Sequence, residues 1–296
     1  ATLGKDQICV TKSEGKVSKL RSLLKEKLNS DYIGIGHTRW ATHGKVSDIN
    51  AHPHKAHNFA IVHNGIIENH ALLKAKLVSE HNVKFTSETD SEVILQLLEI
   101  EQNKHSDIRD IINSVCELLE GSFAIAILSK AWPEKIFLAK NKSSLVVGQN
   151  KNREMFFSSD IAALTSVCKD IAVIEDQHIV EVSREKFVIW NQSGKEIVPK
   201  LLEQNMTSHY SSKRLKFKHF MLSEIYEQEV VLSKLINGSI DKKNRIFKKD
   251  IIGVENFSIK NFDRIIFLGC GTSFYACKVG MYNFEKHLSI PCSVEL

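Results

Sequence analysis

The sequence predicts an α+β chain, and three observations along it lead to that prediction. Between residues 69 and 121 apolar residues recur at helical spacing, whereas from 121 to 200 they alternate with polar residues at the period of a strand. From residue 264 onward an apolar run is followed by a small-residue turn and another helical pattern. Helices followed by strands indicate a layered domain, and the final pattern indicates the opening of a second, α/β domain.

The composition indicates a folded protein of ordinary charge. Of the 296 residues 43% are hydrophobic, which is enough for the cores of two domains, and the formal net charge is only +5. No block of Lys and Arg is interleaved with aromatic residues, so we expect no nucleic-acid partner. No apolar run reaches the roughly 18 residues of a membrane helix. Six scattered cysteines without paired spacing or a secretory leader predict reduced thiols in the cytoplasm.

Three apolar segments in the first 65 residues predict strands, at Gln7–Thr11, Ile33–Gly36 and Phe59–Val62. The third strand is expected to end at an Asn-Gly pair, where the backbone turns out of the sheet. Asn64 offers a side-chain amide, and Gly65 offers a backbone N–H that no Cβ shields. Two such donors side by side form an oxyanion hole, so we interpret this pair as part of a site.

A polar loop, residues 39–47, follows the second of these strands. The guanidinium of Arg39, with the hydroxyl of Thr42 and the imidazole of His43, suits a carboxylate because a planar fork holds both oxygens. A surface loop with an incidental salt bridge is the alternative interpretation of the same residues. Spacing alone leaves both interpretations open.

Six of the thirteen histidines lie between residues 37 and 63, which raises the possibility of a metal site. His52 and His54 form an H-x-H pair that His43 and His63 could extend. No Cys or acidic residue stands beside them at a recognised ligand spacing. We therefore predict no metal and no other cofactor, and we expect most of these imidazoles to bond to the backbone.

Three helices are predicted after Asn69, which we interpret as an N-cap. Their apolar stripes are typical of a core and carry no chemistry. The stripes are Leu73, Leu77 and Val78; then Val93, Ile94, Leu97 and Leu98; then Ile108, Ile111, Ile112, Val115 and Leu119, with Gly121 stopping the third helix.

Beyond Gly121 short strands are separated by turn residues. They are predicted at Phe123–Leu128, Lys135–Ala139, Leu145–Gly148, Met155–Ser158, Ile171–Ile174, Ile179–Val182 and Phe187–Trp190. A polar linker is predicted at 204–218, and HFMLSEIYEQ (219–228) opens a helix that we expect to run on past Glu229.

The last stretch predicts a strand at Ile265–Leu268, the turn GCGTS (269–273), a helix at Phe274–Leu288 and a strand from Ser293. The backbone N–H groups and hydroxyls of Gly271, Thr272 and Ser273 are suited to bind a phosphate. The alternative is that these small residues only allow the strand and the helix to pack closely.

Four motifs in order resemble one known family. HTRWATHG (37–44), NAHPH (50–54), VHNGIIEN (62–69) and SETD (87–90) are similar to the glutaminase domain of the glutamine–fructose-6-phosphate aminotransferases (isomerising). The resemblance implies an N-terminal-nucleophile hydrolase fold, an αββα sandwich, and class II glutamine amidotransferase chemistry. It also implies that residues 219–296 open a sugar-isomerase (SIS) domain with a βαβ unit.

The resemblance assigns a role to each polar group. Arg39, Thr42 and His43 would hold the α-carboxylate of glutamine, and Asp90 would hold its α-ammonium group. Asn64 and Gly65 would form the oxyanion hole, and Trp40 would help close the site. The fructose 6-phosphate site would be lined by Gly271, Thr272 and Ser273.

The resemblance also implies domain bounds and an activity. Residues 1–203 would be the glutaminase domain, 204–218 a linker and 219–296 an incomplete SIS domain. The family hydrolyses glutamine with an N-terminal cysteine and transfers the ammonia to fructose 6-phosphate, giving glucosamine 6-phosphate, and the complete enzyme is a homodimer. Neither Ala1 nor Cys9 matches that nucleophile, so we expect a chain truncated at both ends and inactive alone. The alternatives are a non-catalytic remnant that binds glutamine or a partner, and another class II amidotransferase.

Overall fold

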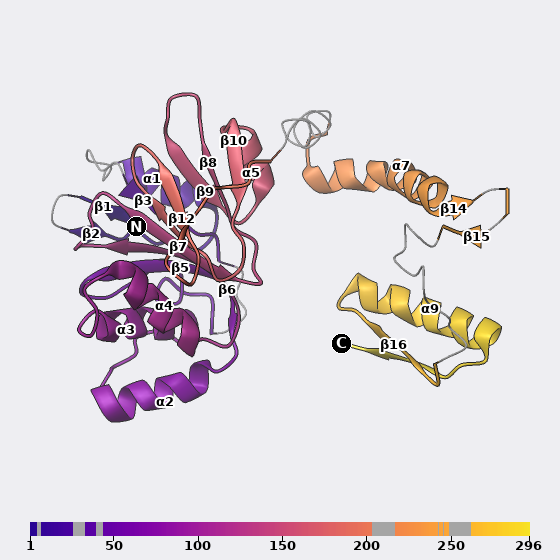
Figure 1. Ribbon diagram of the computed structural model, residues 1–296, viewed down its shortest axis with the longest axis horizontal. Coiled ribbons are helices and arrows are strands. Elements are labelled where there is room, and N and C mark those ends of the chain that lie inside the picture. The colour runs from indigo at the N-terminus through magenta and orange to yellow at the C-terminus, as the bar shows by residue number, and fades with distance from the viewer. Residues whose placement is uncertain are drawn as a thin grey trace. The chain divides into compact units, whose positions relative to one another are not determined.

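The computed structural model describes residues 1–4, 7–25, 33–39, 44–202, 217–241, 243–244, 246–248 and 262–296. The chain divides into two compact units, residues 1–216 and 217–296 (Figure 1). Each unit is considered by itself. In the described residues no helix is both long and apolar enough to cross a membrane.

A seven-stranded antiparallel sheet, counted over the described residues, forms the centre of the first unit. Its strand order is β13-β12-β11-β7-β6-β5-β4. The strands are β4 (His54–Lys55), β5 (Phe59–Ile67), β6 (Gly121–Ser129), β7 (Ile136–Asn141), β11 (Ile179–Val182), β12 (Phe187–Trp190) and β13 (Glu196–Ile197). The longest pairing joins β5 to β6, from Phe59 opposite Ser129 to Ile67 opposite Gly121.

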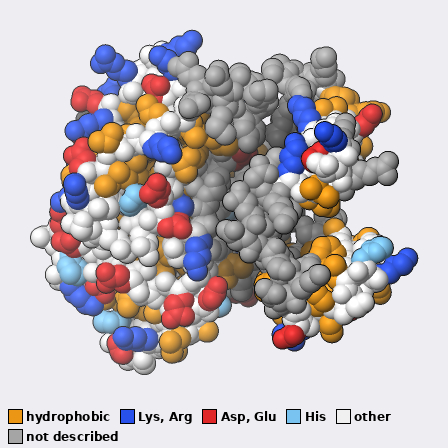
Figure 2. Space-filling model, turned by 45° about the vertical axis from the view of Figure 1, so that its right-hand side comes forward, with side chains coloured by type: hydrophobic (Ala, Val, Ile, Leu, Met, Phe, Trp, Pro, Cys, Tyr) orange, Lys and Arg blue, Asp and Glu red, His pale blue; other side chains and the backbone are white. Residues whose placement is uncertain are grey.

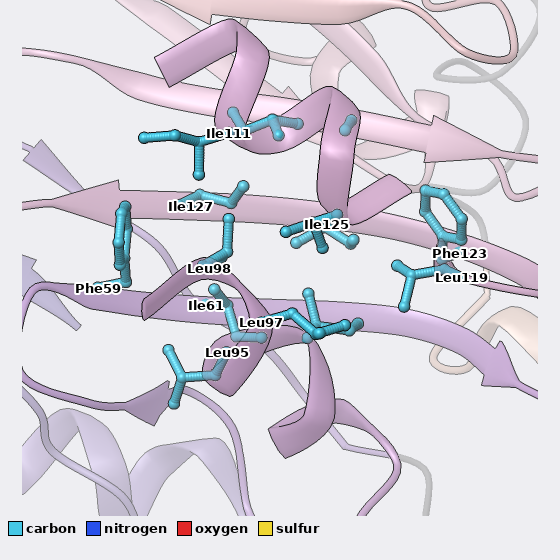
Figure 3. Close-up of a cluster of buried hydrophobic side chains, with 14 of the residues drawn as sticks. Phe59, Ile61, Leu95, Leu97, Leu98, Ile111, Leu119, Phe123, Ile125 and Ile127 are labelled. Atoms are coloured by element: carbon cyan, nitrogen blue, oxygen red, sulfur yellow. The ribbon is translucent and has the colours of Figure 1, made fainter. Parts of the chain in front are cut away.

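Three helices cover one face of this sheet: α2 (His70–His81), α3 (Ser91–Glu101) and α4 (Ile108–Leu118). Alternate residues of a strand point to opposite faces, and on β5 Phe59 and Ile61 point to the helices. They pack with Leu98 of α3 and Ile111 of α4 in a fully buried cluster (Figure 3). The predicted stripes of the second and third helices are all buried, which confirms them as core.

Two smaller sheets cover the opposite face. One has the order β10-β8-β9 and the other β2-β1-β3. Ala60 and Val62 of β5 face this side and share a second core with Val147 of β8 and Leu3 of β1. These elements are β1 (Thr2–Leu3), β2 (Ile8–Cys9), β3 (Ile33–Gly34), β8 (Val146–Gln149), β9 (Met155–Ser158) and β10 (Asp170–Val173).

The outermost layer on that side is helical. Helix α5 (Ile161–Thr165) packs Leu164 against Val146 of β8 in a third, small core. A further helix, α1 (Val17–Lys25), lies between the second and third strands in sequence. The described layers therefore run helix, sheet, sheet, helix, which confirms the predicted αββα sandwich.

Two local predictions were wrong. Strand β5 does not stop at Val62 but continues through Asn64 and Gly65, since each of these residues pairs with β6. Gly65 lies inside the strand with a φ of 124°. Val78 was predicted to face the core with Leu73 and Leu77, yet it is exposed because α2 buries only one narrow stripe.

The second unit contains the predicted strand, helix and strand at its end. Strands β16 (Ile265–Leu268) and β17 (Cys292–Glu295) pair in parallel and are joined by α9 (Thr272–Leu288), so the unit contains a βαβ motif. Helix α7 (Phe220–Ser239) runs past Glu229, as expected. It is followed by the short pair β14 (Ile240–Asp241) and β15 (Ile246–Phe247). Most of the predicted linker lies outside the described residues.

Charged side chains of both signs are mixed on the described surface. Figure 2 shows basic, acidic and hydrophobic side chains interspersed over the described parts of that face. A mixed distribution of this kind produces no strong field of one sign.

A substitution at Gly65 tests the close pairing of β5 with β6. A Cβ at this position would lie 2.0 Å from the carbonyl oxygen of Ser122, and the positive φ suits glycine. We expect Gly65→Ala to lower the free energy of unfolding by about 1 to 3 kcal/mol from backbone strain alone. Denaturant unfolding measures it, with Gly36→Ala as the control because a Cβ there meets nothing within 4 Å. Equal losses for the two variants would contradict this pairing.

Candidate functional site

A cavity of about 960 Å³ opens beside β5 in the first unit. Its described lining includes the two residues predicted to bind opposite ends of a substrate, Arg39 and Asn64. Three histidines also line it, His37, His52 and His63. The cavity therefore combines a cation, an amide and several imidazoles, which is a more polar lining than a packing defect requires.

Asn64 is held from outside the strand. Its Oδ1 lies 2.6 Å from Nε2 of His37, in the segment that follows β3. Asn64 is half-buried, whereas Gly65, the next residue of β5, is exposed and does not line the cavity. Asn64 and Gly65 are thus neighbours in β5, but of these two residues only Asn64 lines the cavity.

Arg39 contacts the loop that follows it. Its Nη1 donates to the carbonyl oxygen of Lys45 at 3.1 Å, and its Nη2 donates to that of Gly44 at 3.3 Å. Gly44 has a φ of 77°, and a Cβ there would lie 2.9 Å from the Cβ of Glu88. Position 44 therefore favours glycine, because a larger residue would clash with Glu88 and disfavour the backbone conformation that brings the Gly44 carbonyl to Arg39.

Glu88 and Asn50 hold the segment at Gly44 and Lys45 in place, and the sequence predicts a role for neither. The amide Nδ2 of Asn50 donates to Oε2 of Glu88 at 3.0 Å, and the backbone N–H of Glu88 donates to Oδ1 of Asn50 at 2.9 Å. The backbone N–H of Lys45 also donates to Oε2 of Glu88. These hydrogen bonds from Lys45 and Asn50 lower the pKa of the Glu88 carboxyl.

Asp90 is buried and does not line the cavity. It is only 5% exposed, and its Oδ2 accepts a hydrogen bond of 2.9 Å from the backbone N–H of Ile67. It stands at the N-cap position of α3 without making a side-chain cap. The structure therefore ties Asp90 to β5 and does not place it among the residues that line the cavity.

The histidines form a buried polar network with hydroxyl groups. The hydroxyl of Ser91 lies 2.8 Å from Nδ1 of His63 and 3.3 Å from Nε2 of His52. His54 Nε2 lies 3.0 Å from the hydroxyl of Thr89. Bonding to the backbone, which we expect for most of these imidazoles, is also present, because Nδ1 of His52 accepts from the backbone N–H of His63 and a backbone hydrogen bond to Ser122 acts on the pKa of His63.

Burial keeps these imidazoles neutral. Loss of hydration lowers the pKa of His54 and of His63 to about 4 each, since the charged form is disfavoured in a dry site. Burial also lowers the pKa of His37 and, more strongly, that of His52. Neutral rings can accept as well as donate, so the network matches the hydroxyl groups around it.

Six other predicted site residues are not among the described residues that line the cavity. Trp40, Thr42 and His43 lie outside the described residues. Gly271, Thr272 and Ser273 lie in the second unit, at the start of α9. Within the described ranges no three His, Cys, Asp or Glu side chains are grouped so as to hold a metal ion.

The neutral histidines predict a loss of stability in acid. The unfolded chain protonates each histidine near pH 6.5, whereas folded His54 and His63 resist protonation until about pH 4. Stability is therefore complete above pH 6.5 and falls as the pH drops from 6.5 to 4. His54→Gln should flatten that fall by up to about 1.4 kcal/mol per pH unit. Denaturant unfolding at several pH values measures the slope, and an unchanged slope would show that His54 is not buried neutral.

Comparison with known proteins relates this geometry to a family. The family described as "Glutamine amidotransferase domain" matches residues 37–166, which include Arg39, Asn64 and Asp90. Glutamine–fructose-6-phosphate aminotransferase (isomerizing) of Aquifex aeolicus is 39% identical over 95% of this chain and 46% of its own length. The enzyme of the same name from Bacillus cereus (strain ATCC 14579) is 36% identical over 100% of this chain and 48% of its own length.

Solved structures give a weaker likeness. A glutamine phosphoribosylpyrophosphate amidotransferase of B. subtilis has a TM-score of 0.46 and 16% identity, covering 87% of this chain and 50% of that one. The chain spans about half the length of the curated relatives that it matches. It carries a glutamine amidotransferase domain and, over nearly all of its 296 residues, is homologous to the glutamine–fructose-6-phosphate aminotransferases.

Proposed function

We propose that the cavity beside β5 binds L-glutamine and that the first unit is the glutaminase part of an aminotransferase. The observation that carries this proposal is the presence of Arg39 and Asn64 in one cavity wall. Glutamine has a carboxylate at one end and an amide carbonyl at the other. A guanidinium and an amide donor complement those two ends.

Arg39 is the proposed ligand of the α-carboxylate. Its guanidinium donates to two backbone carbonyls, and a carboxylate is a stronger acceptor than a neutral carbonyl. Binding would therefore exchange or add to these bonds while Glu88 and Asn50 keep the loop in position. On the family resemblance, Thr42 and His43 are proposed to complete this end of the site, and Trp40 is proposed to help close it.

Asn64 and Gly65 are proposed to stabilise the oxyanion that forms when a nucleophile attacks the amide of glutamine. Asp90 is proposed to take the α-ammonium group. Oδ2 already accepts from Ile67 at 2.9 Å and Oδ1 accepts from the Ser91 hydroxyl at 3.4 Å, so Oδ1 is the more weakly bonded oxygen and the one that would serve the ligand. Because Asp90 does not line the cavity, this role requires its side chain to turn toward the cavity, and a role in holding β5 is the alternative.

The described lining of the cavity offers groups for binding and charge stabilisation but no thiol. No Cys is among the residues that line the cavity. Cys9 is exposed in β2, and burial raises the pKa of the Cys116 thiol to about 12. A thiolate nucleophile needs a lowered pKa and a nearby base. The complete reaction, in which ammonia passes to fructose 6-phosphate, is proposed by homology only.

The second unit is proposed to be the opening of a sugar-isomerase domain. Its parallel βαβ motif and the turn before α9 support this proposal. Gly271, Thr272 and Ser273 would contact the phosphate of fructose 6-phosphate. The proposed domain bounds are 1–203, 204–218 and 219–296. Homodimer formation and a cytoplasmic location are further proposals from the sequence, and a non-catalytic chain that only binds glutamine is the alternative function.

Replacement of Arg39 tests the binding proposal. Loss of a charged hydrogen-bond partner costs about 1.5 to 3 kcal/mol, so Arg39→Ala should weaken binding of L-glutamine by about 10-fold to 150-fold. Titration calorimetry measures the affinity. Arg21→Ala is the matched control, because Arg21 is exposed on α1 and does not line the cavity. Equal affinity of the Arg39 and Arg21 variants would remove Arg39 from the site.

A turnover assay separates the enzyme from the binding-only alternative. We expect residues 1–296 by themselves to release no glutamate from glutamine above background, because the described site lacks a thiol. Fusion of a family-like N-terminal segment that begins with a free cysteine should produce hydrolysis. The matched control carries serine at that position. Release of glutamate by the unfused chain that survives Cys9→Ser would contradict the proposed mechanism.

A further inference from the structure

The orientation of the Asn64 amide carries an inference beyond the binding proposal. An asparagine presents either a donor or an acceptor to a ligand, depending on which end of its amide faces the cavity. Only the donor end, Nδ2, stabilises negative charge on oxygen. A neighbour that fixes the amide therefore decides what the cavity can bind.

We infer that His37 is a positioning residue that fixes the Asn64 amide with Nδ2 toward the cavity, so that this end of the site prefers anionic oxygen. The inference rests on the proposed function, since it assigns a specificity to the same cavity. His37 Nε2 and Asn64 Oδ1 are 2.6 Å apart, the distance of a strong hydrogen bond.

The tautomer of His37 follows from its second nitrogen. Nδ1 is buried and has no hydrogen-bond partner among the described residues. A buried N–H without an acceptor costs more than a bare nitrogen, so the proton resides on Nε2. Nε2–H then donates to Oδ1 of Asn64. The reversed amide would need an acceptor at Nε2 and would leave an unpaired N–H at Nδ1.

The ring of His37 is itself held in place. It stacks on His52 with the ring centres 4.3 Å apart and the planes at 22°. His52 is fixed in turn, because its Nδ1 accepts from the backbone N–H of His63 in β5 at 3.1 Å. Desolvation lowers the pKa of His37, so the ring is neutral at pH 7. The positioning group is therefore anchored to the same strand as the residue that it orients.

Three substitutions of His37 test the inference. Glutamine places a side-chain N–H near the position of Nε2, whereas asparagine is too short and phenylalanine keeps only the ring. The probes are L-glutamate, whose γ-carboxylate is anionic, and L-glutamine, whose amide is neutral. Titration calorimetry at pH 7.5 gives both affinities, and denaturant unfolding confirms that each variant is folded.

We expect His37→Asn and His37→Phe to lower the affinity for glutamate by about tenfold or more and the affinity for glutamine by about threefold. The difference arises because hydrogen bonds to charged groups are stronger than those to neutral groups. His37→Gln should restore most of the glutamate affinity. A wild-type ratio of the two affinities in His37→Asn would overturn the inference and leave the binding proposal intact. Equal losses of affinity for both ligands in all three variants would also overturn the inference, because they indicate that His37 has a structural role alone.

A wild-type chain that binds neither probe would overturn the binding proposal instead. In that case the orientation of the Asn64 amide is followed by NMR, through the chemical shift of its side-chain carbonyl carbon. Its resonance should shift in His37→Asn and stay near the wild-type position in His37→Gln. The absence of any shift would overturn the positioning role independently of any ligand.

Discussion

The antiparallel pairing of β5 with β6 is the constraint on which both the core and the candidate site depend. Over nine residue pairs it fixes which side of β5 faces the helices and which faces the smaller sheets. The same register brings Gly65 against the backbone of Ser122, where no side chain fits. Asn64 is therefore placed in the cavity wall by a strand that cannot shift without unpacking two cores.

Four consecutive residues connect this strand to the rest of the site. Glu88 holds the loop beneath Arg39, and Thr89 contacts His54. Asp90 accepts from β5, and Ser91 joins His52 to His63. Because these residues lie at the start of α3, the packing of that helix in the core fixes the polar groups at its end. The core and the site therefore depend on each other, and a substitution in one is expected to alter the geometry or stability of the other.

Sequence periodicity predicted the helices and the longer strands because burial on one face imposes it directly. It failed where the outcome depended on tertiary contacts. The continuation of β5 through Asn64 and Gly65 required the pairing with β6, and the exposure of Val78 depended on how much of α2 the core covers. At the site, residue type pointed to Arg39 and Asn64. Asn50 and Glu88 lie in two of the motifs, but their hydrogen bonds to each other join residues distant in sequence. Ser91 likewise contacts His52 and His63, and residue type alone predicts none of these contacts.

One cavity wall is proposed to recognise both ends of glutamine. A crystal structure of the chain with L-glutamine is the sharpest test. We expect the α-carboxylate on the Arg39 guanidinium and the amide oxygen within hydrogen-bond distance of Asn64 Nδ2, with His37 still contacting Oδ1. A ligand that occupies the cavity without contacting Arg39, or that meets the oxygen end of the Asn64 amide, would contradict this proposal.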